Sequence, residues 1–93
     1  MTIIAVNYEY DATKLAELAE HRPAHRAFLG SLNEEGTLLA SGPLASNSAL
    51  IVLNVEDREA ALSLLESDPL YKEGIIETRV ARIWNPTLGP WSK

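Results

Sequence analysis

The stretch TLLASGPLASNSALIVLNV, residues 37–55, decides the fold that this sequence predicts. Residues 37–41 and 49–55 have the apolar and β-branched character of strands. The residues between them include a Gly-Pro pair and the sequence Ser-Asn-Ser, which are frequent in turns and connecting loops. The stretch therefore predicts two strands that pair as a β-hairpin in the middle of the chain.

A strand and a long helical stretch precede this hairpin. Residues 2–8 are rich in isoleucine, valine and tyrosine, which favours a strand. Apolar residues then recur at helical spacing until Gly36. Because proline is comfortable only in the first turn of a helix, Pro23 predicts a short helix to about Glu20, a kink, and a second piece that begins near Arg22.

Another helix and a final strand follow the hairpin. Asp57 is suited to cap the N-terminus of a helix over residues 58–65, because its carboxylate can accept a backbone N–H bond. Asp68-Pro69 ends that helix, and we expect a short turn after it. Residues 75–84 predict the last strand, which an Asn-Pro pair closes. The predicted order of elements is βαββαβ.

This order predicts an α+β fold of the ferredoxin-like type, with helices on one face of a four-stranded antiparallel sheet. We expect residues 1–93 to form a single domain. The other face of the sheet would leave apolar side chains in water, and a second copy of the chain is expected to cover it. The sequence therefore predicts a homodimer closed sheet to sheet through the open face.

Composition excludes several classes of protein. With 46% hydrophobic and 23% charged residues, the 93-residue chain is an ordinary globular one. It has no apolar run of about 20 residues and no basic leader, so we expect a cytoplasmic protein that does not bind membranes. The absence of cysteine excludes disulfides, thiolate nucleophiles and cysteine-based metal sites. The net charge of −5 would repel nucleic acid.

The most distinctive segment is His-Arg-Pro-Ala-His-Arg, residues 21–26, which concentrates basic groups in an acidic chain. If a helix restarts here, its unsatisfied backbone N–H groups and the two guanidinium groups would form an anion site. On this interpretation Arg22 or Arg26 binds the charged end of a substrate. The alternative is a solvated face on which both arginines pair with the acidic residues Glu17, Glu20 or Glu34.

His25 is the better candidate of the two histidines. It shares a helical stripe with Phe28, Leu29 and Leu32, so it is expected to face packed surface or a pocket wall, whereas His21 precedes the proline. An imidazole titrates near ~6.5 in water and can act as base or acid close to neutrality. The alternative is a core histidine whose hydrogen bonds are satisfied and which has no chemical role.

Asp68 is the possible partner that would fix the tautomer of His25. A carboxylate before a proline is held on an extended backbone, and in a two-helix layer the end of the second helix can approach the first. The alternative for this Asp-Pro pair is a simple helix stop.

Metal binding and nucleophilic catalysis by serine are not expected. His21 and His25 are four residues apart, but Pro23 lies between them, and no third histidine or any cysteine completes a ligand set. We therefore expect neither a metal nor another cofactor. Ser41 is not in a Gly-x-Ser-x-Gly elbow, so we expect it to contribute to substrate binding at the end of its strand and not to act as a nucleophile.

These residues occur together in an order and spacing that resemble the YciI (YCII-related) family of small bacterial proteins. The resemblance runs from the first predicted strand to the last. It is carried by Arg22-Pro23-Ala24-His25, Phe28-Leu29, Leu32, Glu35-Gly36, Leu38-Leu39, Gly42-Pro43, Asp68-Pro69 and Gly74. Two positions depart from the family's pattern: Arg26 stands where a small or aliphatic residue is usual, and Leu70 stands where an aromatic residue is common. The loop over residues 44–48 is also short.

The resemblance implies a dimeric α+β barrel and an active site built on a histidine and an aspartate, here His25 and Asp68. It also implies small-molecule enzymes, with dehydrochlorination of a hydroxylated aromatic ring as an associated chemistry. The resulting hypothesis is proton transfer on a small cyclic or enolisable anionic compound, by elimination, dehydrochlorination or isomerisation. Two alternatives are a non-catalytic module that binds a small ligand in the same cleft and a purely structural dimer unit.

Overall fold

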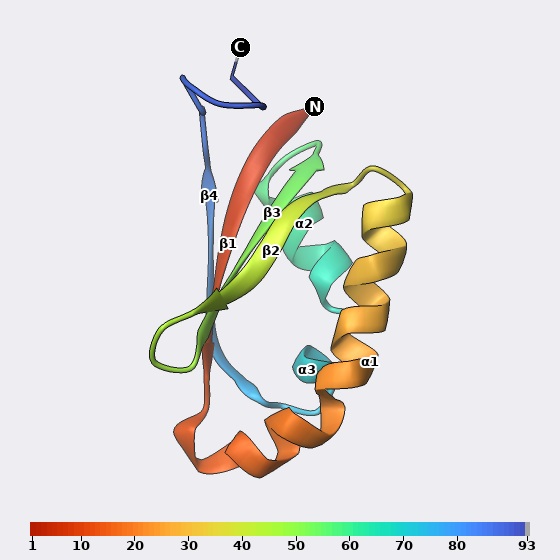
Figure 1. The fold of residues 1–93 in the computed structure, drawn as a ribbon, viewed down its shortest axis with the longest axis vertical. Coiled ribbons are helices and arrows are strands. Elements are labelled where there is room, and N and C mark those ends of the chain that lie inside the picture. The colour runs from red at the N-terminus through yellow and green to blue at the C-terminus, as the bar shows by residue number, and fades with distance from the viewer. Residues whose placement is uncertain (93) are drawn as a thin grey trace.

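The computed structural model describes residues 1–92, in which a four-stranded antiparallel sheet is covered by helices on one side (Figure 1). The strand order is β2-β3-β1-β4. The elements are β1 (Thr2–Tyr10), a 3-10 turn η1 (Ala12–Lys14), α1 (Leu15–Glu34), β2 (Leu38–Leu44), β3 (Ser48–Val55), α2 (Arg58–Leu65), α3 (Pro69–Lys72) and β4 (Ile76–Ile83). The predicted α+β class and βαββαβ sheet topology are confirmed.

The hairpin of β2 and β3 is also confirmed, but its connecting turn begins later than expected. Gly42 and Pro43 are inside β2, where Pro43 pairs with Ala49, so their prediction as loop residues was wrong. Because β2 is an edge strand with a neighbour on one side only, it can accommodate a proline, which has no backbone N–H to donate. The turn is made by Ser46 and Asn47, as the Ser-Asn-Ser sequence predicted, and both have φ near +60° (63° and 61°). Ser48 is already the first residue of β3.

The helix α1 is continuous from Leu15 to Glu34 and contains Pro23, so the prediction of two separate helices was wrong. Figure 1 shows that the axis of α1 nevertheless changes direction in its first, orange part, as expected for an internal proline. Buried residues lie on both sides of the proline, including Leu18 and Leu29, and their packing holds the two parts in one helix.

The second helix has the predicted bounds, whereas the segment after it differs from the prediction. Asp57 caps α2 through a 2.8 Å hydrogen bond that the Ala60 N–H donates to its carboxylate. The expected short turn after Asp68-Pro69 is instead the helix α3, which Asp68 caps and in which Pro69 occupies the first turn. The Asp-Pro pair therefore starts a helix.

The hydrophobic core fills the space between the sheet and the helices. It is formed by side chains from the inner face of the sheet and from α1 and α2, among them Ile4, Val6, Ile51, Leu53, Leu29, Leu32, Ala61 and Leu65. A smaller cluster of Leu18, Leu70 and Ile75 joins α3 to α1. This smaller cluster brings the start of α3 against the middle of α1, where the site described below is located.

The outer face of the sheet carries no helix in residues 1–92 (Figure 1). It exposes apolar side chains, including Leu44 of β2 at 42% and Val80 of β4 at 43%. None of the helices in the described part of the chain is long and apolar enough to cross a membrane.

Candidate active site

A buried histidine and a buried aspartate are in direct contact between α1 and α3. The Nδ1 atom of His25 lies 2.9 Å from Oδ1 and 2.8 Å from Oδ2 of Asp68. The whole of Asp68 is 0% exposed, and His25 is 8% exposed. The two residues are 43 positions apart in the sequence. The contact between them that the sequence analysis considered is therefore present.

The Asp68 carboxylate is held by two further donors. The Tyr8 hydroxyl donates to Oδ2 at 3.0 Å, and the backbone N–H of Leu70 donates to Oδ1 at 3.0 Å. A buried charge is costly unless hydrogen bonds compensate it, and these contacts come from β1, α1 and α3. The carboxylate thus ties three elements together at one point.

This arrangement fixes the tautomer of His25. A carboxylate accepts hydrogen bonds, so the neutral ring carries its proton on Nδ1 and donates it to Asp68. The Nε2 atom is then left with a lone pair, and it receives no hydrogen bond from residues 1–92. Nε2 is therefore the atom of this ring that can accept a hydrogen bond or a proton from a molecule in its surroundings.

A cavity of about 270 Å³ lies between α1 and the inner face of the sheet, and His25 forms part of its wall. Pockets for drug-sized ligands are about 300–1,000 Å³, so this cavity suits a smaller molecule. The predicted residues Arg22, Arg26 and Ser41 also line it. Asp68 does not, because it lies behind the histidine. All five predicted site residues are thus brought into one region.

Arg22 and Arg26 have no acidic partner in the described part of the chain. Neither guanidinium lies within 4.0 Å of a carboxylate of residues 1–92, so the alternative in which both pair with glutamates of α1 is not observed. The expected help from free backbone N–H groups is also absent, because the helix does not restart at Pro23. The positive charge of the cavity therefore comes from the side chains.

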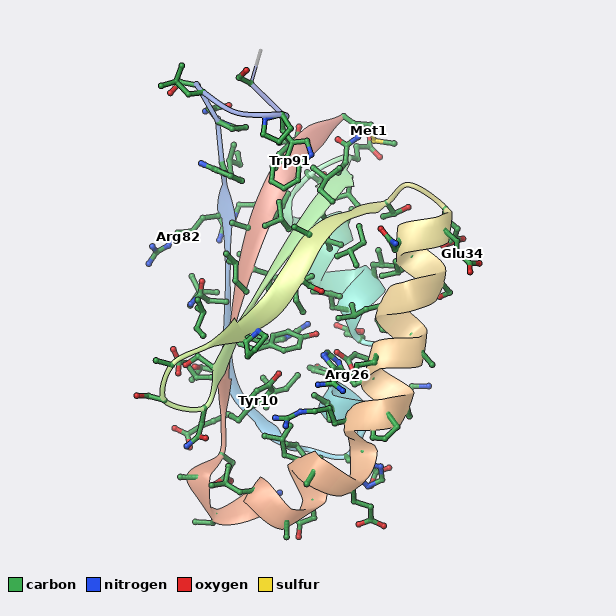
Figure 2. The ribbon with its side chains drawn as sticks, in the orientation of Figure 1. Met1, Tyr10, Arg26, Glu34, Arg82 and Trp91 are labelled. Atoms are coloured by element: carbon green, nitrogen blue, oxygen red, sulfur yellow. The ribbon has the colours of Figure 1, made fainter. Side chains whose placement is uncertain are left out.

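Two tyrosines of β1 were missed in the sequence analysis. Tyr8 holds Asp68, and Tyr10 lines the cavity opposite α1. Figure 2 shows Tyr10 on the sheet side and Arg26 on the helix side of this space. A signal was available, because residues two apart in a strand point to the same face and a buried tyrosine hydroxyl needs a partner.

The surroundings of these tyrosines favour their neutral forms. Burial, followed by the charge of Asp68 and the hydrogen bond to it, raises the pKa of Tyr8 far above its usual value. Burial and the charge of Asp68 also raise the pKa of Tyr10, although Arg22 opposes this shift. Both hydroxyl groups are therefore protonated near neutral pH and can donate hydrogen bonds.

The raised pKa of Tyr8 leads to an expected loss of stability in alkali. Above about pH 10 the unfolded chain has released this proton while the folded chain still holds it. The stabilising contribution is complete below that pH, and the free energy of unfolding then falls by about 1.4 kcal/mol per pH unit for such a group. Urea denaturation between pH 8 and 11 should show a smaller fall for Tyr8→Phe than for the wild type.

The control for this measurement is Tyr71→Phe, because Tyr71 is 39% exposed and its hydroxyl makes no hydrogen bond within residues 1–92. This variant should keep the alkaline slope of the wild type. Equal slopes for Tyr8→Phe and the wild type would show that Tyr8 does not keep its proton in the folded state.

Within residues 1–92 no group of three or more histidine, cysteine, aspartate or glutamate side chains is placed to hold a metal ion. His21 lies 3.9 Å from Glu73 and is not part of the cavity wall.

Comparison with known proteins relates this chain to one family and one fold. The sequence profile of the YCII-related domain matches residues 1–85. No curated protein matches the chain. Among solved structures it is similar to 5-chloro-2-hydroxyhydroquinone dehydrochlorinase (TftG) from Burkholderia phenoliruptrix AC1100 in complex with 2,5-dihydroxybenzoquinone.

The similarity to the dehydrochlorinase has a TM-score of 0.81 and 17% sequence identity, over 98% of this chain and 99% of that chain. At this identity it shows a shared fold. An uncharacterized NIPSNAP domain protein from Burkholderia xenovorans superposes with a TM-score of 0.47 at 16% identity, over 100% of this chain and 99% of that one, which does not establish a common fold.

Proposed function

Because this chain belongs to the YCII-related family, we propose that it is a small-molecule enzyme in which His25 and Asp68 transfer protons. The observation that carries this proposal is the buried His25–Asp68 contact at the wall of a cavity lined by two unpaired arginines. A histidine that served packing alone would need neither a fixed tautomer nor an adjoining space of this size.

The proposed reaction begins with removal of a proton from an acidic C–H of the substrate. Nε2 of His25 forms a bond to this proton, and the C–H electron pair becomes a carbon–carbon double bond or an enolate. In an elimination the adjacent leaving group, such as chloride, departs with its own electron pair. In an isomerisation the imidazolium returns the proton to another carbon. Asp68 stabilises the imidazolium in both cases.

We propose that the substrate is a small ring or another enolisable compound with a negative charge. Arg22 and Arg26 would hold that charge, and Ser41 would donate or accept a hydrogen bond at the strand side of the cavity. Dehydrochlorination of a hydroxylated ring belongs to this class when the ring is in a keto tautomer, in which a saturated carbon beside a carbonyl carries the acidic C–H and the neighbouring carbon carries the chloride. This reaction is supported by the fold shared with the dehydrochlorinase and by the family.

The two arginines provide a test of the ligand class. We expect Arg22→Ala and Arg26→Ala each to raise the Kd for 2,5-dihydroxybenzoquinone about 10- to 150-fold, because each removes a charge-assisted hydrogen bond worth about 1.5–3 kcal/mol. Isothermal titration calorimetry measures this change. Lys72→Ala is the matched control, since it removes one positive charge from an exposed position outside the cavity. Equal affinities for all three variants would exclude an anion site at the arginines.

We also propose that two copies pair through the outer face of the sheet. The exposed apolar side chains on that face, such as Leu44 and Val80, support this arrangement. Sedimentation equilibrium is expected to give twice the mass of a 10.2 kDa chain. A monomer at micromolar concentration would contradict the pairing.

A further inference from the structure

The proposed reaction leaves one charge without an assigned partner. When His25 removes a proton from carbon, the electron pair spreads to an oxygen of the substrate and makes it an enolate or phenolate. Hydrogen-bond donors aimed at such an oxygen are among the largest contributors to catalysis. The arginines are suited to a charge that the substrate already carries, so a different donor is needed where the new charge appears.

Tyr10 is placed to provide this donor. It lies two residues beyond Tyr8 on β1 and lines the same cavity as His25. Its ring packs edge to face against Tyr8, with centroids 6.2 Å apart and an angle of 67° between the planes. The two tyrosines therefore form one aromatic wall, in which Tyr8 contacts Asp68 and Tyr10 lines the cavity. Figure 2 shows Tyr10 on the sheet side of this space.

The two hydroxyl groups are used differently. The Tyr8 hydroxyl donates to Asp68 at 3.0 Å. The Tyr10 hydroxyl makes no side-chain hydrogen bond with any group of residues 1–92, although its residue is only partly exposed. Within the described residues it is thus a donor without an acceptor, on the wall of the cavity that His25 also lines. No side-chain acceptor among residues 1–92 competes with a substrate for this hydroxyl.

The charges around Tyr10 suit a donor of this kind. Burial and the charge of Asp68 raise the pKa of Tyr10, while the positive charge of Arg22 opposes this shift, so the hydroxyl keeps its proton. A protonated hydroxyl can donate a hydrogen bond to an oxyanion without giving up its proton.

We propose that Tyr10 is a further catalytic residue, whose hydroxyl donates a hydrogen bond to the substrate oxygen on which negative charge develops. This inference rests on the proposed function, because it assigns the donor that complements the base His25. No bond to Tyr10 forms or breaks, and its proton stays on the phenol oxygen throughout the step.

The test uses Tyr10→Phe and the probe 2,5-dihydroxybenzoquinone, whose acidic hydroxyls give it charged oxygens near neutral pH. We expect the variant to raise the Kd of the probe about tenfold, as loss of one hydrogen bond to a charged oxygen implies. We also expect the visible absorption band of the bound probe to shift in the variant, toward the wavelength that the probe has in an aprotic solvent, where nothing donates hydrogen bonds to it. Tyr71→Phe, which removes the same hydroxyl outside the cavity, should reproduce the wild type in both measurements.

The outcomes separate this inference from the proposed function. An unchanged Kd and band in Tyr10→Phe, together with weaker binding in Arg22→Ala, would overturn the role of Tyr10 alone. Failure of the wild type to bind the probe at millimolar concentration would overturn the ligand class, and the role of Tyr10 with it. Far-ultraviolet circular dichroism and thermal unfolding of Tyr10→Phe check that the fold is intact, and a loss of folded structure in this variant would assign Tyr10 to structure and overturn the inference.

Discussion

Replacing His25 by alanine is expected to lower kcat/KM by about 10²- to 10⁴-fold, which is the contribution of a well-placed general acid–base group. The loss follows because no other titratable side chain in the described residues both lines the cavity and is held by a carboxylate. The measurement is chloride release from 5-chloro-2-hydroxyhydroquinone, or turnover of another small enolisable anion that the wild type converts.

A second variant separates loss of the base from loss of the folded structure. His25→Ala leaves the fully buried Asp68 short of one donor, which can destabilise the fold. His25→Asn can still donate from its amide to Asp68 but provides no base, so it should fold as the wild type does and lose the same activity. Full activity in a folded His25→Asn variant would exclude His25 from the mechanism.

The matched control is His21→Ala. His21 lies on the same helix, four positions earlier, and its ring approaches Glu73 at 3.9 Å outside the cavity. We expect less than a twofold change in turnover. If both histidine variants retained ligand binding and the wild type converted no substrate, the chain would instead be the non-catalytic binding module.

The sequence predicted those helices and strands well whose ends are set by interactions between residues close together in the chain. Asp57 and the helix it caps were predicted with the correct bounds because a cap and its helix are a few residues apart. Pro43 was assigned to a loop because its tolerance in β2 depends on that strand lying at the sheet edge, which no local pattern encodes. The continuity of α1 across Pro23 similarly depends on tertiary packing.

The same distinction applies to the site. His25 could be selected from its helical stripe, but its contact with Asp68 requires α3 to dock on α1 through Leu18 and Leu70. Helical periodicity carries no information about that docking. The sequence indicated the contact only through the general proximity of helix ends in a two-helix layer and through the resemblance to the family. The role of Tyr8 was missed because the strand pattern shows which residues share a face of the sheet but does not show that the Asp68 carboxylate lies against that face.

Replacing Asp68 by asparagine should be nearly as damaging as removing the histidine, because it reverses the tautomer of His25. The carboxylate accepts a hydrogen bond from the Nδ1–H group, whereas the N–H of an amide in the same place can donate a hydrogen bond to Nδ1. The imidazole would then carry its proton on Nε2, the atom that must act as the base. In hydrolases with a Ser-His-Asp triad the equivalent change lowers kcat about 10⁴-fold, and we expect a loss of about 10²- to 10⁴-fold here.

A spectroscopic measurement separates this tautomer effect from simple loss of structure. Nitrogen-15 spectra of the imidazole should report a protonated Nδ1 in the wild type and a protonated Nε2 in Asp68→Asn. The control is Asp57→Asn, because Asp57 is also a helix N-cap and asparagine caps helices about as well as aspartate. That variant should keep both turnover and the wild-type tautomer. Two outcomes would show that Asp68 does not act by orienting the base: turnover retained in Asp68→Asn, or turnover lost while Nδ1 stays protonated. In either case the buried contacts of Asp68 to Tyr8 and Leu70 would serve only to anchor α3.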